Sequence, residues 1–245
     1  MCFQKTKICL FINCRFNDNK EEGSTYSLKT RGKQSFFVFI LDTSCVTDPR
    51  YRKEFSTDSL NDVIIKLTQL ISKLKLSLGV SFFVTNSIAK EMKNYMLANG
   101  VEESTINEFF MWVTVKMPEK LSIKIPAVIF SEYLKEMRMR EIKALKISED
   151  FIKKAYDLNY DEKNISELIH DLREKFREAM RKGIIDSPED FDAVLLSYEL
   201  KGVLVTNDEG MRKVSEIMGV ITIDPLAFLE NLRRLMIYLN NEEKT

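Results

Sequence analysis

The sequence contains few of the residues that form structural metal sites or disulfide frameworks. Its four cysteines (Cys2, Cys9, Cys14 and Cys45) include no CxxC pair, and His170 is the single histidine among 245 residues. A structural zinc site is therefore not expected. A disulfide framework is not expected in a chain of this length either, which favours a reducing compartment.

Long apolar segments are also absent. No stretch approaches the roughly 20 consecutive apolar residues of a membrane span, and the apolar patch Ile8–Ile12 is too short for the core of a signal peptide. We therefore expect a cytoplasmic protein with no membrane partner. A net charge is missing too, because 37 Lys and Arg residues balance 37 Asp and Glu residues. Affinity for RNA would have to come from a local basic patch.

Residues 1–35 differ from the rest of the chain. From Asn17 to Ser35 they are polar, rich in Asn, Lys and Ser, and without clear periodicity. We interpret residues 1–35 as a poorly ordered or atypical N-terminal extension. A functional appendage is the alternative interpretation.

From residue 36 onward, predicted strands alternate with predicted helices. The continuous apolar run Phe36–Leu41 is typical of a strand buried on both faces. Further strands are predicted at 81–84, 203–206 and 220–223, and extended segments near 112–115 and 123–125. Helices are predicted over 58–78, around 88–96, over 209–218 and from residue 226. This alternation predicts a three-layer α/β fold with a mainly parallel central sheet.

Residues 127–182 contain no Gly or Pro and are predicted to form two long helices, broken near Asn159–Asn164. They would be a helical hairpin inserted into the α/β fold. Arg173, Arg177 and Arg181 recur at every fourth position, which places three guanidinium groups on one helix face. This stripe could bind phosphate. Alternatively, it is a solvated face that the neighbouring Glu174 and Glu178 neutralise.

Acidic residues occur where predicted strands end. Asp42 follows the first buried strand and Asp208 follows the strand at 203–206, while Asp186, Asp190 and Asp192 precede or begin a helix between them. Ligands of open α/β sheets bind at the carboxyl ends of the strands. Carboxylates gathered there repel one another, and Mg²⁺ or Mn²⁺ removes that cost. Such an ion can activate water and stabilise charge on a phosphate, so the pattern favours phosphodiester hydrolysis.

Each of these acids also has a structural interpretation. Asp208 could cap the following helix, and Asp42 could belong to a simple strand-to-helix turn. Ser187 is a suitable N-cap and Asp190 suits the first turn of the same helix. In addition, residues two apart on a helix point in nearly opposite directions. Asp190 and Asp192 therefore cannot both bind one ion closely, and one of them would act through water or position the substrate.

The acidic motifs resemble those of a known nuclease superfamily. Leu41–Ser44, Asp192–Leu196 and Leu204–Asp208 resemble the three acidic motifs of PIN-domain nucleases. The longer segments Arg173–Ala179, Gly183–Asp192 and Tyr198–Val205 resemble one subfamily, the minimal protein-only ribonuclease P proteins (HARP), also known as RNA ligase partner proteins. The resemblance covers residues 36–235, including the hairpin, but not residues 1–35.

The resemblance implies a fold and an activity. Residues 36–126 and 183–245 would form a PIN-like nuclease domain, with 127–182 as the hairpin for RNA recognition and oligomerisation. The activity would be endonucleolytic removal of the 5′ leader from precursor tRNA, with Mg²⁺ or Mn²⁺ and without an RNA subunit, leaving a 5′-phosphate on the mature tRNA. Family members form dimers that build a larger ring-like homo-oligomer, such as a dodecamer.

The resemblance also assigns residues. The catalytic carboxylates would be Asp42, Asp186, Asp190, Asp192 and Asp208, of which Asp42, Asp190, Asp192 and Asp208 would bind metal. Glu91 occupies the place of a further acid on the second helix of many PIN domains. The RNA-binding residues would be Arg173, Lys175, Arg177 and Arg181.

Three other functions compete with this one. A toxin-like PIN ribonuclease would usually be shorter and lack the hairpin. A non-catalytic RNA-binding partner of an RNA ligase would not need five carboxylates at strand ends. A haloacid-dehalogenase-like phosphatase needs a second Asp two residues after the first, but this sequence has Ser44 there.

Overall fold

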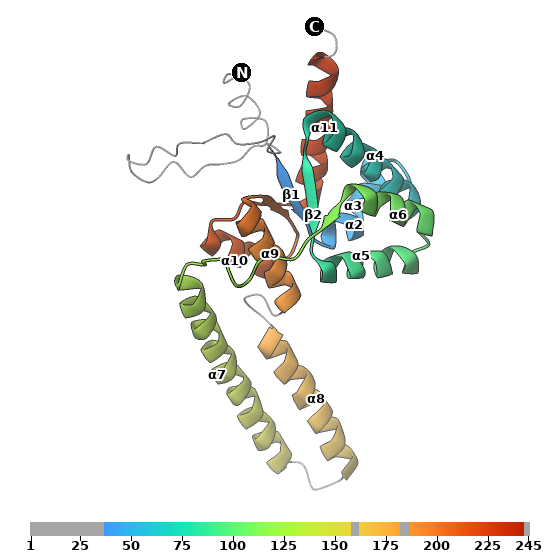
Figure 1. Ribbon diagram of the computed structural model, residues 1–245. Helices are drawn as coiled ribbons and strands as arrows, with labels where there is room; N and C mark the ends of the chain where they lie inside the picture. Colours follow the sequence, from blue (N-terminus) through green and yellow to red (C-terminus); the bar gives the residue numbers. More distant parts are fainter. Residues whose placement is uncertain (1–36, 158–161, 182–186, 243–245) are drawn as a thin grey trace.

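Five short parallel strands form the centre of the molecule (Figure 1). The computed structural model describes residues 37–157, 162–181 and 187–242. The strands are β1 (Val38–Leu41), β2 (Ser81–Val84), β3 (Thr114–Val115), β4 (Val203–Val205) and β5 (Thr222–Ile223). They are ordered β3-β2-β1-β4-β5 and all pairings are parallel. The predicted α/β class with a parallel sheet is therefore confirmed, while the predicted extension at residues 1–35 lies outside the described residues.

The first strand occupies the middle of the sheet. Phe39 of β1 pairs with Phe82 on one side and with Val203 on the other. Phe39, Ile40 and Leu41 are almost completely buried, as expected for a continuous apolar run covered on both faces. After β1, the chain adds β2 and β3 on one side of the sheet. After the hairpin, it adds β4 and β5 on the other side of β1. The crevice for a ligand is therefore expected at the carboxyl ends of β1 and β4, where the direction reverses.

Helices cover both faces of the sheet and create three layers (Figure 1). On one side, α4 (Leu60–Leu78) packs against α6 (Glu103–Trp112) and α11 (Pro225–Glu242). The ring of Phe228 from α11 lies 5.2 Å from the ring of Phe39. On the other side, α9 (Pro188–Leu200) packs against β1, β4 and α10 (Glu209–Met218). The helices α2 (Ser44–Thr47), α3 (Arg50–Glu54) and α5 (Asn86–Ala98) follow strand ends or precede longer helices.

A long antiparallel pair of helices projects from this domain (Figure 1). It consists of α7 (Val128–Asp157) and α8 (Glu162–Arg181), so the predicted hairpin of two long helices is present. Ala144, Phe151 and Ala179 are buried in it. The guanidinium Nη1 of Arg140 donates a hydrogen bond to the carbonyl of Met180 at 2.7 Å, which ties the two helices together near the domain.

The predictions about the segment before the hairpin were confirmed only in part. The residues around Trp112 were expected to be extended, but Trp112 ends α6, and only Thr114–Val115 form a strand. Thr105, Ile106 and Phe109 face the core from α6 at helical spacing, over a stretch too short to distinguish from strand alternation. Ile123 lies in the irregular connection to α7 rather than in a strand.

Candidate active site

Asp42 stands at the carboxyl end of β1 and is firmly held. The residue is 9% exposed. The oxygen Oδ2 accepts hydrogen bonds from Ser44 Oγ and Thr206 Oγ1, both at 2.9 Å, and from the Ser44 backbone N–H at 3.4 Å. All of these bonds reach Oδ2. No described residue donates a hydrogen bond to the other oxygen, Oδ1, so Oδ1 can serve as a ligand atom.

Asp208 stands at the neighbouring strand end, and the same threonine connects it to Asp42. The backbone N–H of Asp208 donates to Thr206 Oγ1 at 3.0 Å, while that hydroxyl donates to Asp42. Asp208 is also the N-cap of α10, because its Oδ1 accepts from the Met211 N–H at 2.7 Å. Asp208 thus caps α10 and Asp42 lies in a strand-to-helix turn, as their positions in the sequence predicted. Both leave a second carboxylate oxygen for a ligand.

Glu91 approaches the same edge from α5. Its Oε2 accepts a hydrogen bond from Thr43 Oγ1 at 2.9 Å. Thr43 directly follows Asp42 in the chain, so Glu91 lies beside the end of β1 although 48 residues separate it from Thr43 in sequence. Glu91 is exposed to solvent. The structure therefore brings this predicted acid to the site.

Asp190 and Asp192 begin α9, whose N-terminus lies at the carboxyl edge of the sheet because the helix runs back before β4. Ser187 caps this helix by accepting from the N–H groups of Glu189 at 3.1 Å and Asp190 at 3.3 Å, which confirms the predicted cap. Asp192 is 6% exposed. Its Oδ1 forms an ion pair with Lys120 Nζ at 2.5 Å. Lys120 comes from the connection between β3 and α7, a partner that the sequence did not indicate.

The strand-end carboxylates suit a divalent cation that needs few protein ligands. Asp186 lies outside the described residues. Within the described ranges, no group of three or more His, Cys, Asp or Glu residues is close enough to hold a metal ion. Mg²⁺, however, usually keeps several waters and is held by only one or two carboxylates. Asp42 and Asp208, which share the hydroxyl of Thr206, fit that requirement.

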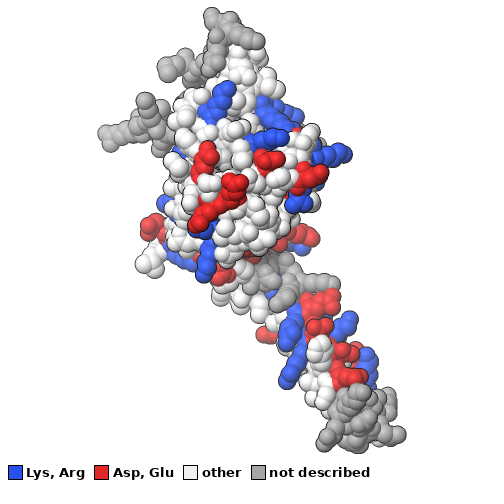
Figure 2. Space-filling view, turned by 90° about the vertical axis from the view of Figure 1, so that its right-hand side faces the viewer, with Lys and Arg blue, Asp and Glu red and all other residues white. Residues whose placement is uncertain are grey.

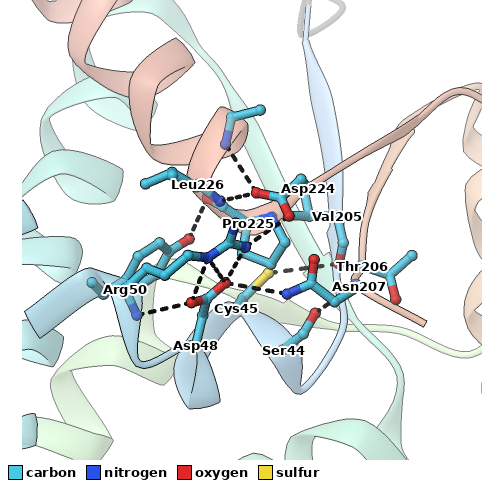
Figure 3. Close-up of polar contacts among 12 residues, drawn as sticks. Ser44, Cys45, Asp48, Arg50, Val205, Thr206, Asn207, Asp224, Pro225 and Leu226 are labelled. Carbon is cyan, nitrogen blue, oxygen red and sulfur yellow. Dashed lines mark hydrogen bonds and ion pairs between the residues drawn. The ribbon is translucent and has the colours of Figure 1, made fainter. Parts of the chain in front are cut away.

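A second polar cluster lies beside this site, and our predictions from the sequence did not include it (Figure 3). Asp48 receives hydrogen bonds from Arg50, whose Nη2 lies 2.5 Å from Oδ2. Burial raises the pKa of Asp48, but the bonds from Arg50 outweigh burial and hold that pKa below its usual value. Arg50 also contacts Asp224, which follows β5, at 2.7 Å. Asp48 and Asp224 both precede a proline at the start of a helix, which is the sequence signal that could have indicated them.

The candidate RNA-binding residues lie on the hairpin. Arg173, Lys175 and Arg177 are exposed on α8 and form no ion pair with any other described residue. The side chain of Arg181 lies outside the described residues. On the face shown in Figure 2, basic and acidic side chains alternate along the projecting arm. On this face, phosphate binding would therefore depend on individual side chains rather than on a uniform basic surface.

Comparison with known proteins identifies the class. The model of the PINc domain ribonuclease family matches residues 38–237, which include the whole sheet and the hairpin. The chain belongs to this class of nucleases, in agreement with its parallel sheet and strand-end carboxylates.

Curated relatives narrow the class to one family. The RNA-free ribonuclease P of Ignicoccus hospitalis is 41% identical over 202 residues, covering 82% of this chain and 96% of that protein. That of Staphylothermus marinus is 37% identical over 209 residues, covering 81% and 95%. That of Archaeoglobus fulgidus is 30% identical over 213 residues, covering 84% and 94%. The chain belongs to the RNA-free ribonuclease P family, as its motifs predicted.

Proposed function

We propose that this protein is an RNA-free ribonuclease P, an endoribonuclease that removes the 5′ leader of precursor tRNA without an RNA subunit and leaves a 5′-phosphate on the mature tRNA. The observation that carries the proposal is the match over nearly the full length of proteins named for this activity, at up to 41% identity. The match spans the nuclease domain and the hairpin together. A toxin-like ribonuclease without the hairpin would not give this match.

The strand-end carboxylates would hold the metal. Asp42 Oδ1 and the second oxygen of Asp208 are the proposed direct ligands. Ser44 and Thr206 orient the Asp42 carboxylate. The Met211 N–H orients the Asp208 carboxylate, while Thr206 holds its main chain. When bound, Mg²⁺ or Mn²⁺ supplies positive charge that activates water and stabilises charge on the scissile phosphate. Asp186, Asp190, Asp192 and Glu91 would complete the acidic set, directly or through water molecules.

Lys120 balances the charge of Asp192 within this acidic set. Its Nζ lies 2.5 Å from Asp192 Oδ1, and half of the lysine side chain is exposed. A buried carboxylate needs such a partner, because an isolated buried charge is costly. Asp192 would therefore act at the edge of the site, positioning a water molecule or the substrate.

The hairpin would recognise the folded tRNA at a distance from the cleavage site. Proteins read RNA helices mainly through shape and backbone contacts. Arg173, Lys175, Arg177 and Arg181 offer guanidinium and ammonium groups that suit phosphate. Their position on an arm projecting from the nuclease domain would allow one part of the protein to measure the tRNA while another part cuts it.

We further propose that the hairpin joins copies of this chain into a dimer and a larger homo-oligomer, such as a dodecamer. Large apolar side chains of α7 are exposed along the length of the helix: Phe130, Leu134, Leu145, Ile152 and Tyr156. They are between 51% and 87% exposed. Apolar surface of this kind is typical of association sites.

The location that fits these properties is the cytoplasm. The cysteine pattern favours a reducing compartment. In the part of the chain that the structure describes, no helix has the length and apolar character needed to span a membrane.

The decisive experiment incubates purified protein with Mg²⁺ and a precursor tRNA that carries a 5′ leader. Wild-type protein should release the mature tRNA with a 5′-phosphate. Asp42→Ala and Asp208→Ala should each lose most of this activity, whereas Asp58→Ala, which removes an exposed carboxylate elsewhere, should retain it. No cleavage by the wild type, or equal cleavage by the aspartate variants, would contradict the proposal. Cutting at internal sites of unrelated RNA would favour a toxin-like ribonuclease.

A further inference from the structure

Asp48 is a buried charge that lies just outside the carboxylate set. Its side chain is 2% exposed, and Arg50 supplies the compensating charge. Arg50 Nε donates to Asp48 Oδ1 at 2.9 Å, Nη2 lies 2.5 Å from Oδ2, and the Arg50 backbone N–H donates to Oδ1 at 2.9 Å. Such a two-pronged arginine–carboxylate pair has a fixed geometry. Asp48 is therefore a rigid acceptor within the loop that follows β1.

Asp48 holds the loop that carries Asp208. The side-chain amide of Asn207 donates to Asp48 Oδ2 at 3.2 Å, and its backbone N–H donates to Ser44 Oγ at 3.2 Å. Asn207 lies between Thr206, which contacts Asp42, and Asp208. Its main chain and its side chain are thus both fixed to the loop after β1 (Figure 3).

Arg50 extends the connection to the end of β5. Its Nη2 donates to Asp224 Oδ2 at 2.7 Å, and Asp224 Oδ1 accepts the Leu226 N–H at 2.7 Å, which caps α11. Arg212 completes the connection, because its Nε and Nη2 donate to the Thr206 carbonyl at 3.1 and 2.9 Å. One network therefore ties together the ends of three adjacent strands, β1, β4 and β5.

We infer that Asp48, Arg50 and Asp224 are positioning residues that fix the separation of the Asp42 and Asp208 carboxylates and so set the affinity of the site for a divalent cation. This inference rests on the proposed function, because it takes the two carboxylates as the metal ligands. A direct role of Arg50 in binding RNA phosphate fits less well. The charges of Asp48 and Asp224 balance those of Arg50 and Arg212, and the Arg50 fork is already occupied by two carboxylates.

The expected effect follows from how metal sites respond to their supporting residues. Loss of a hydrogen-bonding partner behind the ligands typically weakens metal binding about 10- to 100-fold. Asp48→Asn keeps the shape of the side chain but removes the charge that Arg50 and Asn207 contact. Asp224→Asn removes the ion pair with Arg50 while keeping a good helix cap. Asp48 and Asp224 lie one residue further from the proposed ligands. Both variants should therefore bind Mn²⁺ about tenfold more weakly than wild type, at the lower end of this range.

The test measures Mn²⁺ binding to the RNA-free protein by calorimetry, together with thermal unfolding of each variant. Glu54→Gln is the matched control, because it breaks an ion pair of α3 with Arg233, 2.6 Å apart, that does not touch the strand-end loops. Glu54→Gln should leave the Mn²⁺ affinity unchanged. Cleavage by Asp48→Asn and Asp224→Asn should recover as Mn²⁺ is raised, with the KM for precursor tRNA unchanged.

The inference is wrong if folded Asp48→Asn or Asp224→Asn binds Mn²⁺ as tightly as wild type, whatever its melting temperature. If Asp48→Asn does not fold, the Asp224→Asn result decides. Wild-type protein that binds no Mn²⁺ would overturn the inference as well. Wild-type protein that binds Mn²⁺ but does not cut precursor tRNA would overturn the proposed function alone, since the binding comparison still tests the positioning network.

Discussion

A single hydroxyl group connects the Asp42 carboxylate to the main chain of Asp208. Thr206 Oγ1 donates to Asp42 and accepts from the Asp208 N–H, and Thr206 is completely buried. A buried polar group that loses its partner costs more than the net gain from making the bond. Thr206 therefore influences both the stability of the fold and the position of the candidate ligands.

This position gives a prediction for Thr206. Thr206→Val keeps the shape of the side chain but leaves the Asp208 N–H without its acceptor, so unfolding should become easier by about 1–3 kcal/mol. Cleavage should fall sharply, because Asp42 loses one of its fixed donors. Thr206→Ser, which keeps the hydroxyl, should retain most of the activity. Urea unfolding and single-turnover cleavage measure the two effects, and equal behaviour of both variants would contradict this role.

At the scale of elements, the position of the hairpin relative to the nuclease domain depends on the connection between β3 and α7. Residues 116–120 of that connection are fixed to α9. Lys116 forms an ion pair with Glu199, and Glu199 Oε2 also accepts the Glu119 N–H at 2.8 Å. Lys120 adds the ion pair with Asp192. The helix that begins with candidate catalytic acids is therefore also the helix that anchors the segment leading into the hairpin.

The basic residues of α8 provide the prediction for this element. The double variant Arg173→Ala/Arg177→Ala should bind precursor tRNA more weakly, and the slope of log K against log salt should become shallower by roughly 0.7–0.9 for each phosphate that is no longer neutralised. Lys146→Ala, which changes an exposed basic residue on α7, is the control and should change neither quantity. Filter binding between low and moderate salt measures the slope. An unchanged slope would mean that the stripe is only a solvated face.

At the scale of the whole molecule, the apolar residues of α7 concern self-association. Leu145 and Ile152 are 60% and 69% exposed in the single chain, although both lie on a long helix that already packs against α8. Leaving such a surface in water has no benefit for an isolated monomer. In the proposed homo-oligomer, a second copy of the chain would cover these apolar residues.

The corresponding prediction concerns assembly size. Leu145→Glu and Ile152→Glu should each shift the protein to a smaller species in analytical ultracentrifugation, because a charge would be buried in the interface. Met111→Glu changes a residue that is 75% exposed on α6 and should leave the size unchanged. A monomeric wild type, or variants with wild-type size, would exclude this surface as the interface.

Local patterns predicted the features of the molecule that depend on neighbouring residues. The apolar run before Asp42 predicted β1, Ser187 predicted the start of α9, and the absence of Gly and Pro predicted the hairpin. The network around Arg50 could not be predicted in this way, since Arg50 and Asp224 are 174 residues apart. The partner of Asp192 was equally hidden, because Lys120 follows a short edge strand without clear periodicity. Contacts between distant loops leave no periodic signal in a sequence.

The central place of β1 has a consequence for the newly made chain. A nascent chain that ends at α8 already contains Asp42 and Glu91, but β4, the neighbour that supplies Thr206 and Asp208, follows the hairpin. Domains generally fold as units during synthesis. An unfinished chain of this length therefore holds two of the six candidate acids, without the strand that positions Asp42. The nuclease would therefore become competent only after the ribosome has synthesised β4 and the aspartate that follows it.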